Sequence, residues 1–113
     1  MTGRVVHALG SIPHDLYVGR SMPSRGLFNW MLANPYKVGS DGDRQECLEK
    51  YEQYMRERIQ REEAVAKTVY SLQDLTLACW CAPKDGPPLT LDDELICHGQ
   101  VLLRLSEEMR SSP

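Results

Sequence analysis

The sequence predicts a single small α/β domain over residues 1–113, with a short central sheet flanked by helices. Three observations point to this fold class. Short strand-like segments lie near the N-terminus, an amphipathic helical repeat fills the middle, and an apolar strand follows that repeat. Strands that alternate with helical segments are typical of α/β proteins. With 42% hydrophobic and 26% charged residues, the chain has the composition of a globular domain.

Two short strands are expected first. Arg4–Leu9 is rich in Val and is closed by a Gly-Ser-Ile-Pro turn, and Leu16–Val18 is ended by Gly19. The following stretch to Asp43 is rich in Gly, Pro, Ser and Asn and carries an apolar island at Phe28–Leu32. A long loop with its own apolar residues inside a small domain is more often a binding loop than a linker.

The best-defined element is a helix that begins after Asp43 and ends at about Arg61. Asp43 and Glu46 have the spacing of a capping box. Behind them, apolar residues recur at steps of three and four: Cys47, Leu48, Tyr51, Tyr54, Met55 and Ile59. The apolar positions between Val65 and Leu72 indicate that this helix continues or that a second short helix follows.

A buried strand is expected at Leu75–Trp80, followed by a Gly-Pro-Pro turn and a last helix. That helix starts either at Thr90, with Asp93 as its capping partner, or near Cys97. The second start keeps Gly99 out of the helix interior, where glycine costs about 1 kcal/mol. The tail from about residue 110 is expected to fray.

The charge balance argues against nucleic acid as a partner. The net charge is −3, whereas nucleic-acid binding needs a basic face. The N-terminal third is locally basic and could hold a small anion. No apolar run resembles a membrane span or a secretory signal, so we expect no membrane partner and a cytoplasmic location. Cysteines in such a protein are expected to be free thiols or metal ligands rather than disulfides.

Three of the four cysteines and one of the three histidines gather around the last expected strand. The set of Cys79, Cys81, Cys97 and His98 suits a tetrahedral zinc ion through thiolates and imidazole. A second hypothesis is catalytic: a helix that begins at Cys97 would lower the pKa of that thiol, with His98 beside it as a proton carrier. The third is that the cysteines are simply buried core residues.

A candidate ligand site lies in the N-terminal half. Arg20 follows Gly19 at the end of a strand, where α/β sheets usually open their ligand crevice. Asn34, Asp41 and Arg44 are predicted to converge there, beside the amides of a helix N-terminus. Because guanidinium groups bind phosphate and carboxylate through a planar fork, this grouping predicts a phosphorylated or nucleotide-like small ligand.

Five motifs follow one another along the chain: Tyr17–Arg20, Asn34–Tyr36, Val38–Arg44, Cys79–Pro83 and Cys97–Gly99. Their order resembles the domain-of-unknown-function family 4326, which comprises small intracellular bacterial and bacteriophage proteins without an established activity. The resemblance implies a small α/β fold and favours the ligand crevice by analogy. In the family pattern the Cys-Trp-Cys-x-Pro element runs almost directly into Cys-His, whereas here residues 84–96 intervene. If these residues fold outward, the two elements meet; if they carry the last helix away, the cysteines are mostly core.

The leading hypothesis is therefore one crevice at the strand ends that binds a small ligand, with or without catalysis. The alternative is a non-enzymatic interaction module, stabilised by zinc or by homodimerisation. Such a module would meet a protein partner through the apolar island at Phe28–Leu32.

Overall fold

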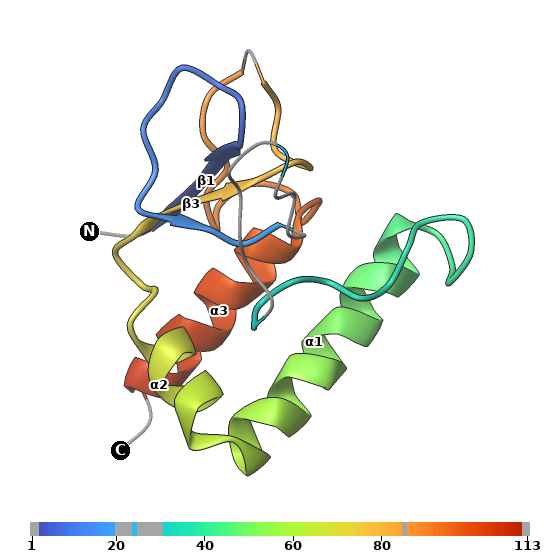
Figure 1. Ribbon diagram of the computed structural model, residues 1–113, viewed down its shortest axis with the longest axis vertical. Coiled ribbons are helices and arrows are strands. Elements are labelled where there is room, and N and C mark those ends of the chain that lie inside the picture. Colours follow the sequence, from blue (N-terminus) through green and yellow to red (C-terminus); the bar gives the residue numbers. More distant parts are fainter. Residues whose placement is uncertain (1–2, 20–23, 25–30, 85, 112–113) are drawn as a thin grey trace.

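A computed structural model of the protein describes residues 3–19, 24, 31–84 and 86–111. Figure 1 shows the strands gathered at one end of the molecule and the helices at the other. The α/β class predicted from the sequence is confirmed. Within the described residues the elements are β1 (Arg4–His7), β2 (Leu16–Tyr17), α1 (Arg44–Arg61), α2 (Glu63–Tyr70), β3 (Thr76–Cys79) and α3 (His98–Ser111).

The three strands form one parallel sheet in the order β1-β3-β2. Val5 of β1 pairs with Leu77 of β3, and Tyr17 of β2 pairs with Ala78 on the other side. The sheet thus joins the N-terminal strands to a strand from the C-terminal half. Since the strands are parallel, all three end at the same edge, and the residues that follow them are brought together there.

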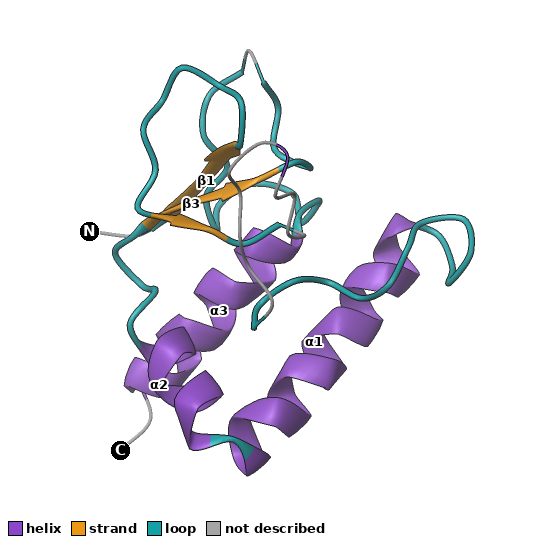
Figure 2. Cartoon of the chain, in the orientation of Figure 1, coloured by secondary structure: helices purple, strands orange, loops and turns teal. Residues whose placement is uncertain are grey.

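The helices form a layer on one side of the sheet, in which α3 alone among the described helices packs against the strands (Figure 2). α3 packs on β1 and β3, and both α1 and α2 pack on α3. Successive residues of each strand point to opposite faces of the sheet. Val5 and Leu77 belong to the main core together with helix residues such as Leu102, whereas Val6 and Ala78 belong to a small second cluster. No helix in the described ranges is both long and apolar enough to cross a bilayer.

α1 begins where the capping box predicts. The Asp43 carboxylate accepts the N–H of Glu46 at 2.8 Å, and the Glu46 carboxylate accepts the N–H of Asp43 at 3.2 Å. The chain turns out of the helix at Glu62, so α2 is a separate helix and not a continuation. The buried stripe of α1 consists of residues that the sequence periodicity selects, Cys47, Leu48, Tyr51 and Met55.

The last helix begins at His98, the second of the two starts considered. Thr90 and Asp93 form a local turn instead, in which the Asp93 carboxylate accepts the N–H of Thr90 at 2.8 Å. Gly99 lies against β1: a Cβ atom there would be 2.9 Å from a methyl group of Val5. Glycine at this position therefore allows the first turn of α3 to approach the sheet.

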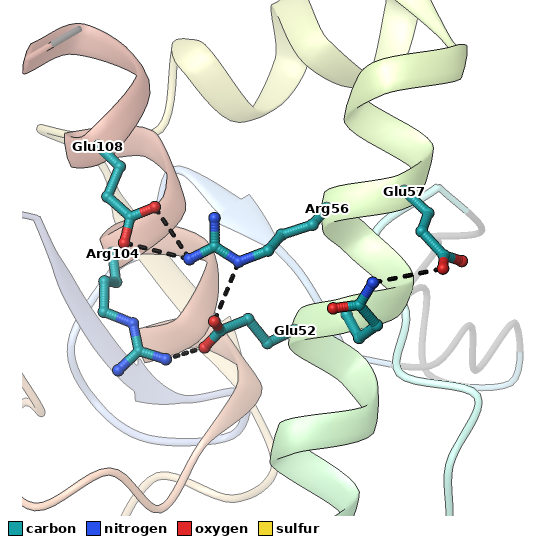
Figure 3. A network of polar contacts seen from close by, with 6 residues as sticks. Glu52, Arg56, Glu57, Arg104 and Glu108 are labelled. Atoms are coloured by element: carbon teal, nitrogen blue, oxygen red, sulfur yellow. Dashed lines mark hydrogen bonds and ion pairs between the residues drawn. The ribbon is translucent and has the colours of Figure 1, made fainter.

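Exposed ion pairs join α1 to α3 (Figure 3). Glu52 of α1 accepts hydrogen bonds from Arg56, one turn later, and from Arg104 of α3. Arg56 also contacts Glu108 of α3 at 3.0 Å. Because these groups are partly solvated, each pair is expected to contribute at most about 1 kcal/mol.

Some sequence predictions fall on residues that the structure does not describe. These are the ligand role of Arg20, the aromatic part of the apolar island at Phe28 and Trp30, and the end of the tail at residues 112–113. The last two residues of the island are described: Leu32 is buried in the main core, and Met31 packs against that core.

Candidate functional site

Three cysteines and one histidine cluster at the carboxyl end of β3. The ligand atoms of Cys79, Cys81, Cys97 and His98 all lie within 4.8 Å of one another. Cys79 ends β3, Cys81 stands in the turn that follows, and His98 begins α3. The two elements of the sequence thus meet although residues 84–96 separate them. The cluster could hold a metal ion.

Three distances between ligand atoms are close to those of a tetrahedral site, whereas the Sγ atoms of Cys81 and Cys97 lie at disulfide-bond distance. The Sγ atom of Cys79 is 3.2 Å from the Sγ atom of Cys81 and 3.5 Å from Nδ1 of His98. The Cys81 Sγ atom is 4.0 Å from the same nitrogen. Zinc bonds of normal length at tetrahedral angles place sulfur and nitrogen ligands roughly 3.5 Å apart. With the Cys81–Cys97 pair reduced and its two sulfur atoms apart, the four side chains could surround an ion.

The segment before α3 returns to the sheet instead of leading the helix away. Leu89 pairs with Val5 as an antiparallel bridge, with both N–H···O hydrogen bonds at 2.8 Å. This bridge adds the intervening segment to the outer side of β1. It explains why the insertion leaves the two cysteine elements in contact.

Gln100 fixes the last residues before α3. Its side chain is fully buried. Its Oε1 atom accepts the N–H groups of Ile96 and Cys97 at 2.9 and 3.0 Å. Its Nε2 group donates to the carbonyl oxygens of Thr90 and Glu94. One side chain thus satisfies four backbone groups and holds Cys97 at the cluster.

His98 is oriented by contacts on two sides. Its Nε2 atom lies 2.7 Å from the carbonyl oxygen of Val18, just after β2. A carbonyl only accepts hydrogen bonds, so Nε2 carries the proton and donates. Nδ1, the nitrogen within 4.0 Å of both Cys79 and Cys81, is then the unprotonated ring nitrogen. The ring of Tyr51 packs edge-on against the imidazole, with 5.2 Å between the ring centroids. Metal-binding histidines are held in this way by a carbonyl on the opposite ring nitrogen.

The three cysteines differ in burial. Cys79 and Cys97 are 2% and 0% exposed, whereas Cys81 is only partly buried. Burial raises the pKa of the free Cys79 thiol to about 11, so without a metal that thiol is protonated at neutral pH. Cys81 and Cys97 are within disulfide-bonding distance, with Cα atoms 5.4 Å apart. Cys97, the nucleophile considered from the sequence, has no surface open to a substrate.

An open crevice of about 680 Å³ adjoins the cluster. Three groups of residues line it. The cluster contributes Cys79, Cys81 and His98, and Trp80 lies between the two cysteines. The end of β2 and the following loop contribute Gly19, Asn34, Tyr36, Lys37 and Val38, and the remainder comes from Arg44, Cys47, Leu48 and Ile96. The crevice therefore lies where parallel α/β sheets usually hold their ligands.

Of the four residues predicted to bind a ligand, Asn34 and Arg44 line this crevice. Asp41 does not, because its carboxylate accepts a backbone N–H within its own loop, that of Lys37, at 2.8 Å. Arg20 lies outside the described residues. The structure thus brings two of the four together beside the cysteine cluster.

The N-terminus of α1 is capped by side chains of the helix itself. The carboxylates of Asp43 and Glu46 occupy the capping positions there and would repel a negative charge. Positive charge at the crevice comes from side chains instead. Arg44 and Lys37 line it, and neither has a carboxylate partner among the residues that the structure describes.

Sequence reasoning did not select several residues that shape this site. Lys37 has no signal of its own beyond its place in a locally basic region, although it directly follows Asn34–Tyr36. Trp80 stands between two cysteines and lines the crevice, and its position alone was a usable signal. Gln100 had no comparable signal, since its role depends on backbone groups that only the folded chain brings to it.

Comparison with known families agrees with the motif resemblance. The chain matches the family described as Domain of unknown function (DUF4326) over residues 6–108. This range includes all four cluster residues and every residue that lines the crevice. No curated protein and no solved structure matches the chain significantly. Since the match spans most of the sequence, the chain belongs to the DUF4326 family.

Proposed function

We propose that this protein binds a small phosphorylated, nucleotide-like ligand in the crevice, next to a structural zinc ion. The zinc ligands are Cys79, Cys81, Cys97 and His98. The proposal is carried by one observation: two cations without carboxylate partners among the described residues line a cavity whose wall is a cluster of soft metal ligands. Catalysis is not needed to explain this arrangement.

The lining of the crevice suits a ligand with a flat apolar part and an anionic part. Its volume of about 680 Å³ is within the usual range of small-molecule sites. Trp80 and Tyr36 offer aromatic surface, and Arg44 and Lys37 offer charge for a phosphate. The aromatic wall is preformed, because the indole N–H of Trp80 donates to the hydroxyl of Tyr17 at 2.7 Å. A preformed wall reduces the ordering cost of binding.

The proposal of zinc rests on ligand chemistry. Three thiolates and one imidazole prefer zinc to the hard cations magnesium and calcium. The hydrogen bond from His98 to the Val18 carbonyl leaves Nδ1 unprotonated, as a metal ligand must be. Four protein ligands leave no open coordination position, so the ion would be structural rather than catalytic. A reducing cytoplasmic compartment would keep the thiols available for the metal.

A thermal-shift screen with nucleotides and sugar phosphates tests the ligand site. A ligand at ten times its Kd stabilises the protein by about 1.4 kcal/mol, which raises Tm by several degrees in a domain of this size. Arg44→Ala is expected to abolish the shift. Arg61→Ala is the matched control, because Arg61 lies at the far end of the same helix and does not line the crevice. The ligand site is contradicted by a screen without a hit, or by a hit that Arg44→Ala retains.

Metal analysis tests the zinc site independently. Protein purified without a histidine tag, in reducing buffer and without chelators, is expected to contain about one equivalent of zinc. X-ray absorption at the zinc edge is expected to show three sulfur ligands and one nitrogen ligand. Cys47→Ser is the control, since Cys47 lies outside the cluster and should leave the zinc content unchanged. A zinc content below about a tenth of an equivalent would contradict the site.

A further inference from the structure

We infer that Cys81 is an oxidation site through which peroxide converts the zinc-bound cluster into a Cys81–Cys97 disulfide and expels the metal. This inference rests on the zinc site proposed above. It goes beyond that proposal because it assigns different roles to the three cysteines and names a second reactant, a hydroperoxide.

The first observation is unequal exposure of the three sulfur-bearing residues. Cys81 is partly exposed and lines the open crevice. Cys97 is fully buried and does not line the crevice, and Cys79 lines it with only 2% of its surface exposed. A small oxidant that enters the crevice therefore meets Cys81 first. Oxidation of cysteine follows accessibility and thiolate character, and zinc coordination keeps a cysteine in the thiolate form.

The second observation is that Cys97 is positioned to complete a disulfide with Cys81. Their Cα atoms are 5.4 Å apart, inside the range in which a disulfide forms without backbone movement. The Gln100 side chain accepts the backbone N–H of Cys97, which holds the backbone of this residue at the cluster. Cys79 also has its sulfur near that of Cys81, at 3.2 Å, but the structure pairs Cys81 with Cys97.

The chemistry balances in two steps. The Cys81 thiolate attacks hydrogen peroxide; an S–O bond forms, the O–O bond breaks, and hydroxide leaves and takes a proton to become water. The Cys97 thiolate then attacks the sulfenic sulfur of Cys81; an S–S bond forms, the S–O bond breaks, and hydroxide leaves and takes a proton from solvent to become the second water. The two sulfur atoms together lose two electrons, which reduce the peroxide to two waters.

The metal cannot stay when this bond forms. The disulfide removes two of the four ligands as thiolates and leaves only Cys79 and His98. Two ligands do not form the closed coordination shell that a structural zinc requires. Zinc leaves as Zn²⁺, and the Cys79 thiolate takes a proton from solvent. Zinc and the Cys81–Cys97 disulfide are therefore mutually exclusive states of one cluster.

Stepwise oxidation of zinc-loaded, reduced protein tests the inference. Hydrogen peroxide is added in portions, released zinc is measured with a chelating dye, and each sample is examined by intact mass and peptide mapping. We expect about one equivalent of zinc to appear in proportion to a mass loss of about 2 Da and a Cys81–Cys97 crosslink. Zinc release without this crosslink, or the crosslink with zinc retained, would overturn the inference.

Two further measurements keep the test independent of how single variants fold. The double variant Cys79→Ser, Cys97→Ser lacks both thiols that neighbour Cys81 and is expected to stop at the sulfenic acid, which dimedone traps on Cys81. Arg61→Ala, which lies outside the crevice and the cluster, is expected to behave as the unaltered protein. In the unaltered, reduced and metal-free protein, brief alkylation is expected to label Cys81 before the two buried cluster cysteines; equal or reversed labelling contradicts the role of Cys81. The zinc content before peroxide is added tests the metal site itself, so failure of that proposal is recognised separately.

Discussion

The helical layer and the carboxyl edge of the sheet are built from different kinds of buried side chain. Beneath the helices the fully buried residues are mostly aliphatic, as in Val65, Val69 and Leu102, with Tyr51 and Ser106 as polar exceptions. At the carboxyl edge they include His98 and Gln100, together with the cysteines. The first region is held mainly by close packing, with hydrogen bonds at Tyr51 and Ser106, whereas the second depends on a partner for each of several buried polar groups.

This difference distinguishes the carboxyl edge of the sheet, where buried polar side chains are concentrated, from the helical layer. Among the described residues, no buried side-chain nitrogen or oxygen lacks a hydrogen-bond partner, so the edge meets its polar requirement. A hydrophobic edge would have met the demands of folding with fewer constraints. The helical layer supports the edge, and the edge holds the candidate metal site and the crevice. Four changes break or sharpen this comparison.

Removal of the proposed zinc ion is expected to lower the free energy of unfolding more than the other changes, because its ligands lie at the carboxyl edge of the sheet. When zinc is present at about a thousand times its Kd, binding contributes about 4 kcal/mol to the free energy of unfolding. Urea unfolding of the reduced protein, with zinc and with an excess of chelator, measures the difference. An unchanged midpoint would mean that hydrogen bonds alone hold the edge together.

Leu102→Ala breaks the helical layer instead. Leu102 is fully buried in the main core, and its truncation is expected to lower the free energy of unfolding by about 3 kcal/mol. The folded variant should still contain as much zinc as the unaltered protein. Leu102→Met is the matched control and should cost less than about 1.5 kcal/mol. Loss of zinc from folded Leu102→Ala protein would show that the two regions are not separable.

Gln100→Leu affects the edge without removing a metal ligand. The N–H groups of Ile96 and Cys97 lose their acceptor, which is expected to cost about 2 kcal/mol. Because Cys97 is then less well positioned, zinc affinity should fall by about 10- to 100-fold in competition with a chelating dye. Ser106→Ala is the control: Ser106 is a buried polar residue of the same helix that bonds the Tyr70 carbonyl, far from the cluster. Its loss should leave zinc affinity unchanged.

Glu52→Gln is expected to have the smallest effect. The ion pairs of Glu52 with Arg56 and Arg104 lie near the surface, so the variant should lose less than about 1 kcal/mol of stability (Figure 3). The difference should shrink further in about 1 M salt, where charges are screened within about 3 Å. Thermal unfolding at low and high salt measures both. A larger loss that salt does not reduce would mean that these charges act as part of the core.

Most of the fold could be predicted because its signals are local. The capping box at Asp43 and the apolar stripe behind it define α1 from sequence alone. The start of α3 could not be decided in this way. Thr90 and Asp93 have the spacing of a helix cap, yet the chain there forms only a turn. The helix begins at His98, and the side chain of Gln100 in this helix accepts the N–H of Ile96 in the segment before it.

The candidate site could be predicted in part. Cysteine and histidine are rare in this chain and stand close together in its sequence, so the set of ligands was visible. The path of residues 84–96 was not, because the pairing of Leu89 with Val5 joins segments that lie far apart along the chain. Asp41 was predicted to bind a ligand, but its carboxylate accepts a hydrogen bond from the backbone N–H of Lys37 in its own loop. A homodimer or a protein partner stays a prediction.

The bridge between Leu89 and Val5 has a consequence for self-association. β1 and β2 are the outer strands of the sheet, and an unpaired strand edge is a template for another chain. β2 has only two residues, which makes it too short to recruit a partner strand, and Leu89 occupies the outward-facing backbone groups of Val5. The insertion that separates the two cysteine motifs in the sequence therefore also shields the sheet. A chain shortened through this segment could still bring its cysteines together, but it would expose an edge on which copies of the protein could aggregate.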